Sequence, residues 1–179
     1  MKNLKIRLTW AKATLISLIL LSGLVTIHAI DSDKSVQSKK TLWEAQHKLI
    51  TTTGEDFKIK PVKGKFILIN FWATWCAPCR RELPELNLFN GKRNKNQVQV
   101  LAVCVDNAPK KIKAFLKNMD VHFEVLIDNK ERLSDFYKIS QMPTTILLNS
   151  EGLPVFRSEG YSPETIKKIK QIIEDKDES

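Results

Sequence analysis

The stretch Phe71-Trp72-Ala73-Thr74-Trp75-Cys76-Ala77-Pro78-Cys79 decides both the fold and the chemistry of this chain of 179 residues. It joins the end of an apolar run, residues 66–72, to two cysteines that are three positions apart. A near-continuous apolar run is typical of a strand that is buried on both faces of a sheet. We expect a helix over residues 76–90, which Pro84 kinks and Gly91 ends. The sequence therefore predicts a buried strand that leads directly into a helix carrying a cysteine pair.

A cysteine at the start of a helix is predisposed to act as a nucleophile. Backbone N–H groups and the helix dipole favour a negative thiolate there, and such a setting lowers a cysteine pKa from about 8.5 to between about 3.5 and 7.5. Cys76 is therefore the expected attacking thiol. Cys79 lies one turn deeper. We expect it to attack the mixed disulfide that Cys76 forms with a partner molecule, and so to release that partner. Pro78 suits the first turn of a helix, and Ala77 adds no charge.

Two other uses of this cysteine pair stay open. A Cys-x-x-Cys pair can form half of a zinc site, and the other candidate ligands, Cys104, His47 and His122, are isolated along the sequence. The pair can also form a static structural disulfide, although so short a loop stabilises a protein little. We favour the redox interpretation over both, and we expect no cofactor and no metal.

The quoted stretch resembles the active-site signature of the thioredoxin superfamily. Its continuation, Arg80-Arg81-Glu82-Leu83-Pro84, resembles the extracytoplasmic TlpA/ResA-like branch. The resemblance covers roughly residues 41–174 and implies a thioredoxin fold, with Cys76 as the attacking and Cys79 as the resolving thiol. It also implies a cis bond between Met142 and Pro143, beside the dithiol, where the backbone faces a bound substrate strand.

The resemblance extends to the surface on which a partner would bind. We expect Trp75 to form part of the docking surface for a partner protein, next to Ala77 and Pro78 in the loop between the cysteines. With Met142 and Pro143, these residues make up the expected substrate-binding set.

Two polar residues near the cysteines, Asn70 and Glu82, bear on proton transfer at the dithiol. Asn70 stands where ordinary thioredoxins carry a buried Asp that assists proton transfer, and an Asn cannot titrate. Glu82 matches an acidic residue of the ResA-like branch that lies near the dithiol. If Glu82 is partly buried, its pKa rises and it can exchange protons near neutral pH, which makes it a candidate catalytic residue. The alternative is a Glu on the helix surface that pairs with a lysine.

Strands and helices alternate along the rest of the chain. This order predicts an α/β thioredoxin fold, with a mixed central sheet flanked by helices. The segment between Cys79 and Pro143 is longer than in plain thioredoxin, and we assign the inserted strand–helix unit to residues 106–127. Cys104, inside an apolar strand, is expected to be a core thiol. We expect strands at 57–59, 66–72, 98–105, 123–127, 144–148 and 155–158, helices at 109–118, 131–137 and from 163 onward, and fraying over 174–179.

The first thirty residues have the pattern of a targeting segment. Residues 1–12 form a positively charged start with basic but no acidic side chains, and residues 13–30 form an uncharged apolar run. This run is longer than the usual signal core of about 7–15 residues and slightly shorter than the roughly 20 residues of a membrane span. We favour an uncleaved anchor in the inner membrane over a cleaved signal peptide. Both place the rest of the chain outside the cytoplasm, in the periplasm or its equivalent, because the basic flank stays inside.

Residues 31–40 are polar and are expected to be a linker, which leaves 41–179 as the thioredoxin-like domain. The formal net charge is +9, but the basic residues are scattered. Because the chain shows no dense basic stripe with interleaved aromatic residues, we expect no binding to nucleic acid.

The resemblance implies an enzyme that reduces specific protein disulfides outside the cytoplasm. One such substrate is apocytochrome c, whose heme-attachment cysteines must be reduced during cytochrome c maturation. A membrane thiol reductase would then supply the electrons. Because the Ala77–Pro78 pair lacks a His that would stabilise the thiolate, we expect a reducing potential within the superfamily range of about −270 to −120 mV. Two alternatives stay open: a general disulfide oxidase or isomerase of secreted proteins, and a copper-handling assembly protein that uses His122.

Overall fold

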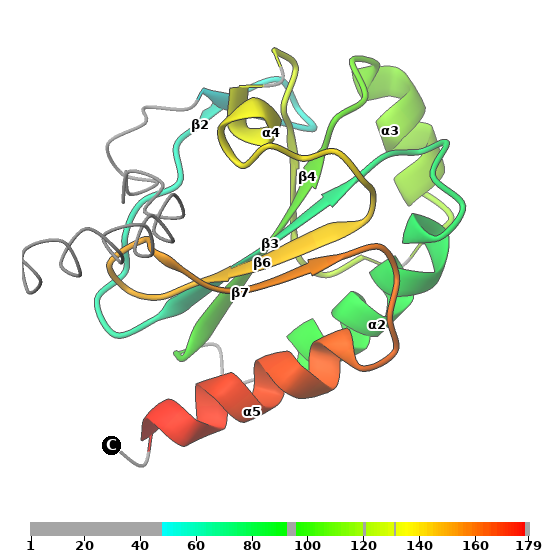
Figure 1. Ribbon diagram of the computed structural model, residues 1–179. Coiled ribbons are helices and arrows are strands. Elements are labelled where there is room, and N and C mark those ends of the chain that lie inside the picture. Colours follow the sequence, from blue (N-terminus) through cyan, green and yellow to red (C-terminus); the bar gives the residue numbers. More distant parts are fainter. Residues whose placement is uncertain (1–47, 93–95, 120, 131, 178–179) are drawn as a thin grey trace, which may run out of the picture. The chain divides into compact units, whose positions relative to one another are not determined.

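The described residues form a seven-stranded mixed sheet with helices packed on both faces (Figure 1). The computed structural model describes residues 48–92, 96–119, 121–130 and 132–177. The strand order is β2-β1-β5-β4-β3-β6-β7. The strands are β1 (Leu49–Thr51), β2 (Asp56–Phe57), β3 (Phe66–Trp72), β4 (Val98–Cys104), β5 (Glu124–Ile127), β6 (Thr144–Leu148) and β7 (Pro154–Glu159); the helices are α2 (Cys79–Lys92), α3 (Pro109–Leu116), α4 (Arg132–Phe136) and α5 (Thr165–Asp177).

Strand β3 lies in the middle of the sheet, and all of its residues are buried. It pairs in parallel with β4 and antiparallel with β6. Successive side chains point to opposite faces of a strand, so Leu68 and Trp72 join one core while Ile67 and Phe71 join the other. The prediction of a fully buried strand over residues 66–72 is confirmed.

The two faces of the sheet are covered by different helices. Leu86 of α2 and Ile169 of α5 pack in the same core as Leu68, whereas Leu133 of α4 packs in the core on the opposite face. Figure 1 shows α2 and α5 together on one side of the sheet and α4 on the other. This arrangement leaves the carboxyl end of β3 next to the start of α2.

The helix that carries the second cysteine begins later and ends later than expected. It spans Cys79–Lys92 rather than 76–90. The N–H of Cys76 bonds to the carbonyl oxygen of Ala73 at 3.1 Å, which makes a turn before the helix. Gly91 does not end the helix but lies inside it, because glycine adopts helical as readily as other backbone angles. Pro84 lies inside α2 as expected, and the kink stays a prediction.

Short edge elements also differ from the sequence-based expectation. Strand β1, which pairs with β5, was missed, since three residues show no periodic pattern. Helix α5 starts at Thr165 rather than at 163, and it continues to Asp177, so residues 174–177 are helical where fraying was expected. The last turns are held because Ile173 is buried and Lys176 lies 5.2 Å over the ring of Phe66. The other expected elements are present, with ends shifted by one or two residues.

The region to which the inserted unit was assigned, residues 106–127, forms α3 and β5, and β5 lies parallel to β4. The N-terminal segment 1–30, the linker 31–40 and the first residues of the domain lie outside the described residues. Among the residues that the structure describes, no helix has the length and apolar character needed to cross a membrane.

Candidate active site

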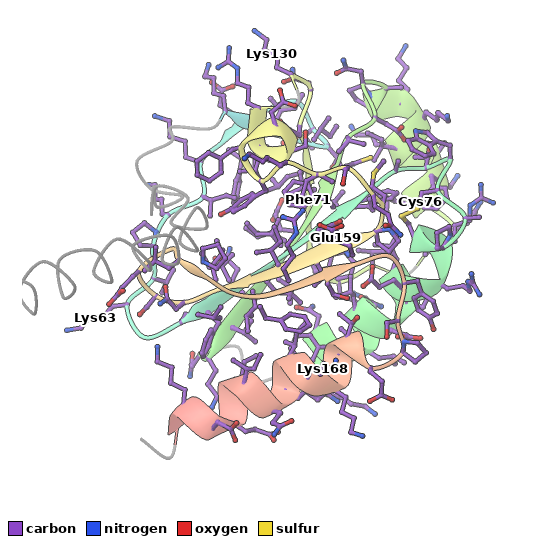
Figure 2. The ribbon with its side chains drawn as sticks, in the orientation of Figure 1. Lys63, Phe71, Cys76, Lys130, Glu159 and Lys168 are labelled. Atoms are coloured by element: carbon purple, nitrogen blue, oxygen red, sulfur yellow. A yellow bond between two sulfur atoms is a disulfide. The ribbon has the colours of Figure 1, made fainter. Side chains whose placement is uncertain are left out.

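A disulfide joins Cys76, in the loop after β3, to Cys79, the first residue of α2. Their Cα atoms are 5.3 Å apart, and both residues are buried. The backbone N–H of Cys79 donates to Sγ of Cys76 at 3.2 Å. Figure 2 shows Cys76 at one end of the sheet and Lys63, which precedes β3, at the other.

A cis peptide bond joins Met142 to Pro143, as the family resemblance implied. Strand β6 begins at Thr144, which pairs with Phe71 near the end of β3. Because antiparallel strands run in opposite directions, the start of β6 lies beside the carboxyl end of β3, at the same end of the sheet. Met142 packs against the core cluster that contains both cysteines. The tertiary structure therefore brings Met142 and Pro143 to the same end of the sheet as the dithiol.

The loop around the cysteines presents an exposed aromatic ring. Trp75 is 61% exposed, whereas its neighbour Thr74 is 4% exposed. Ala77 is exposed and Pro78 is half-buried. These three expected docking residues therefore lie where a partner protein can reach them.

Glu82 is buried, one turn of α2 after Cys79. Its Oε2 accepts a hydrogen bond from Nδ2 of Asn70 at 2.9 Å, and its Oε1 accepts one from the hydroxyl of Thr145 at 3.0 Å. Burial raises the pKa of Glu82, although the two hydrogen bonds oppose this effect. The alternative of a surface Glu paired with a lysine is therefore wrong, and the group fits proton exchange.

The partners of Glu82 were not identified from the sequence. Asn70 and Thr145 face each other across β3 and β6, and Nδ2 of Asn70 also donates to Oγ1 of Thr145 at 2.9 Å. A polar side chain in a fully buried strand needs a hydrogen-bond partner. Asn70, the one amide in an otherwise apolar strand, was the available signal; nothing local pointed to Thr145.

Two of the remaining candidate metal ligands, Cys104 and His122, lie within the described residues. Cys104 is a buried free thiol, as expected, and burial raises its pKa to about 12. His122 is bound to the later part of α2: its N–H donates to Oδ1 of Asn87 at 2.7 Å, and its carbonyl oxygen accepts from Asn90 at 2.6 Å. His47 lies outside the described residues. Among those that are described, no three His, Cys, Asp or Glu side chains are grouped so that they could hold a metal ion.

Known proteins are similar to this chain in sequence and in fold. The model of the AhpC/TSA family matches residues 33–153. The thiol-disulfide oxidoreductase ResA of Bacillus subtilis is 38% identical over 103 residues, which span 56% of this chain and 56% of that protein. The protein of the same name from Bacillus cereus is 29% identical over 147 residues, 81% of this chain and 85% of that one. The crystal structure of StoA from Bacillus subtilis superposes with a TM-score of 0.60 at 28% identity, covering 71% of this chain and 97% of that chain.

The family match covers more than half of the chain, and the matched region contains the disulfide loop and the cis-proline. The chain therefore belongs to the AhpC/TSA family; it is a thioredoxin-like thiol–disulfide oxidoreductase that is similar to the ResA proteins.

Proposed function

We propose that Cys76 and Cys79 reduce specific protein disulfides outside the cytoplasm, with apocytochrome c in cytochrome c maturation as one substrate. The observation that supports this most is that the Cys76–Cys79 pair, after the end of β3, and the cis Met142–Pro143 bond, before the start of β6, lie at the same end of the sheet. An extended substrate segment can pair with the backbone next to such a proline. Its disulfide then lies over the cysteines, and Trp75 contacts the partner.

The reaction begins with the reduced dithiol. The thiolate of Cys76 attacks one sulfur of the partner disulfide, whose second sulfur leaves and takes up a proton. Cys79 loses its proton and attacks Sγ of Cys76, which forms the Cys76–Cys79 disulfide and expels the partner's first sulfur. This sulfur also takes up a proton, so the partner leaves as a dithiol. Two electrons pass to the partner. Glu82, one turn after Cys79 and with a pKa raised by burial, suits the role of proton acceptor for Cys79.

The N-terminal segment gives the proposed compartment. The basic residues 1–12 and the apolar run 13–30 favour a membrane anchor with the domain on the outer side. A membrane thiol reductase would reduce the Cys76–Cys79 disulfide after each cycle and so return the protein to its active form.

The test is the reduction potential of the full chain, measured by equilibration with glutathione or dithiothreitol buffers. A reductant requires a value toward the negative end of the range of about −270 to −120 mV found among related dithiol proteins. A value near −120 mV would contradict the proposal and support a disulfide oxidase, which would use the same residues.

A trapping experiment addresses the substrate. In Cys79→Ser the resolving thiol is absent, so the mixed disulfide on Cys76 should accumulate and carry the substrate with it. Cys76→Ser is the matched control and should trap nothing. If Cys79→Ser forms no mixed disulfide with proteins outside the cytoplasm, the chain does not act on protein disulfides there.

A further inference from the structure

The peptide groups of Thr74, two residues before the first cysteine, are held on both sides. The backbone N–H of Thr74 donates to Oδ2 of Asp106 at 2.8 Å. The carbonyl oxygen of Thr74 accepts a hydrogen bond from Nη2 of Arg80 at 3.3 Å. One side chain from the region after β4 and one from the first turn of α2 therefore meet at the same residue.

The sheet explains why Asp106 reaches this loop. Strands β3 and β4 are parallel, so both end at the same edge of the sheet. Their pairing continues past the last strand residues, because the N–H of Val105 donates to the carbonyl oxygen of Trp72 at 3.0 Å. Asp106 is the next residue, and Thr74 lies two residues after Trp72. The two loops are therefore adjacent.

The position of Arg80 is set by an aromatic stack. Its guanidinium carbon lies 5.9 Å from the ring centroid of Phe115 in α3, and that ring lies 5.4 Å from the ring of Trp72. A guanidinium over an aromatic ring gains a favourable cation–π interaction. Helix α3 thus places the donor that binds the carbonyl oxygen of Thr74.

The hold on Thr74 matters because the next residues are the reactive ones. Thr74 is buried, whereas Trp75 projects into solvent and Cys76 follows it. The N–H of Cys76 returns to the carbonyl oxygen of Ala73 at 3.1 Å. The direction of the exposed ring and of the first sulfur therefore depends on how the peptide groups of Thr74 are oriented.

We propose that Asp106 and Arg80 are positioning residues of the redox site. They hold the N–H and the carbonyl group of Thr74 and so orient Trp75 and Cys76 toward the disulfide of a protein partner. This inference rests on the proposed reduction of protein disulfides. It assigns to the loop after β4 and to α3 a part in the reaction with large substrates.

Positioning differs from two other effects that the same side chains could have. The charge of Asp106 could act on the thiolate, and its loss could weaken the whole fold. Asp106→Asn removes the charge but keeps an oxygen that can accept the Thr74 N–H, whereas Asp106→Ala removes both. Asp56→Ala is the matched control. Asp56 lies on strand β2, and its side chain forms an exposed ion pair with Lys48.

The experiment compares a large and a small disulfide substrate of the reduced full-length chain. Reduction of a disulfide in insulin, the protein substrate, requires the correct orientation of Trp75 and Cys76. A small aromatic disulfide reagent, in contrast, can approach Cys76 from many directions. Because misplacement of a reacting group can cost about 100-fold in rate, we expect Asp106→Ala to slow insulin reduction by about 10-fold or more. The reaction with the small reagent should change by less than about twofold. Asp106→Asn should recover most of the insulin rate.

Amide hydrogen exchange measures separately whether the Thr74 N–H is held and whether strand β3 stays folded. The N–H of Thr74 should exchange faster in Asp106→Ala than in the wild type and be protected again in Asp106→Asn, while amides of β3 stay protected. If Asp106→Ala does not fold, Arg80→Gln tests the same prediction, with Arg132→Gln on α4 as control. The double variant Asp106→Asn/Arg80→Gln should be slower with insulin than either single variant.

The outcomes separate the two proposals. If the wild type does not reduce insulin or any protein disulfide, the proposed function fails. If the wild type reduces insulin and both Asp106→Ala and Arg80→Gln match their controls, the function stands and the positioning role is refuted. Equal slowing of insulin and of the small reagent would also refute it, because that result indicates an effect on the thiol itself.

Discussion

At the scale of single residues, the buried carboxyl of Glu82 is the group with the clearest consequence for chemistry. It lies one turn after Cys79 and accepts hydrogen bonds from Asn70 and Thr145. Neither partner is a cation, so its charge is compensated only by neutral donors. Desolvation therefore outweighs hydrogen bonding and raises the pKa.

Substitution of Glu82 should change the reactivity of the reduced dithiol. An ionised carboxylate near a thiolate disfavours the second negative charge, so Glu82→Gln should shift the pH profile of alkylation by iodoacetamide to lower pH. Glu164→Gln, an exposed position on the surface, is the control. Cys104 should not contribute, because it is buried and its pKa is raised to about 12. A profile identical to that of the wild type would show that Glu82 does not act on the dithiol.

The same residue should make stability depend on pH. Its pKa in the folded state lies above the value of 4.5 taken for the unfolded chain. Below pH 4.5 both states are protonated; as pH rises through the folded pKa, the unfolded state ionises first and stability is lost. Glu82→Gln lacks this loss, so its stability relative to the wild type should increase from pH 4 to pH 8. Urea unfolding of the oxidised proteins measures the difference, and a constant difference across this range would contradict the assignment.

At the scale of elements, the turn between β7 and α5 supports the cis-proline segment. The N–H of Gly160 donates to the carbonyl oxygen of Pro143 at 2.7 Å, and Gly160 has a φ of +74°. A Cβ atom at this position would lie 2.8 Å from Nε2 of Gln141. This turn therefore does more than connect β7 to α5, because it also binds the cis-proline segment.

Replacement of this glycine should affect both stability and reaction rate. Gly160→Ala should destabilise the fold by about 1–2 kcal/mol, since non-glycine residues are strained at positive φ. It should also slow insulin reduction, because the bond to Pro143 is disturbed. Gly54→Ala is the matched control: Gly54 has a φ of +95° but open space around its Cβ. Stability is measured by urea unfolding. Equal insulin rates in the two variants would show that Gly160 does not support the site.

At the scale of the whole molecule, the two cores are built from residues that lie between Leu49 and Ile173. Both cores share the central strand β3, so the sheet and its helices should unfold together. The residues that bind Glu82 lie in β3 and β6, and those that hold Thr74 lie in the loop after β4 and in α2, all of which pack around the same sheet. The redox site is therefore part of the folding unit rather than an appended loop.

A fragment of residues 41–179 should fold alone and keep its redox activity. We expect its urea midpoint to equal that of the full chain in the same mild detergent, since both described cores lie within it. Its rate of insulin reduction should also be equal. A fragment without a cooperative transition would show that the N-terminal segment contributes to the fold.

Several elements could be predicted from the sequence because their signals are local. A run such as Phe66 to Trp72 shows burial on both faces without any knowledge of its neighbours. Strand β6, Thr144 to Leu148, was predicted with the same bounds for the same reason. Strand β1 was missed because its three residues are defined by their pairing with β5. The start of α2 was misplaced because the turn at Ala73 and Cys76 competes with helix in that loop.

The sequence by itself determined the cysteine pair and the central strand, since spacing and apolar runs are properties of neighbouring residues. The proline beside the dithiol was implied only by the resemblance to the thioredoxin superfamily. Only the tertiary structure decided what surrounds the pair. Asn70 meets Thr145, 75 residues later, through the register of β3 and β6. Asp106 meets Thr74 because two parallel strands end together. Hydrogen bonds between distant residues depend on strand order and register, and these result from the packing of the whole sheet.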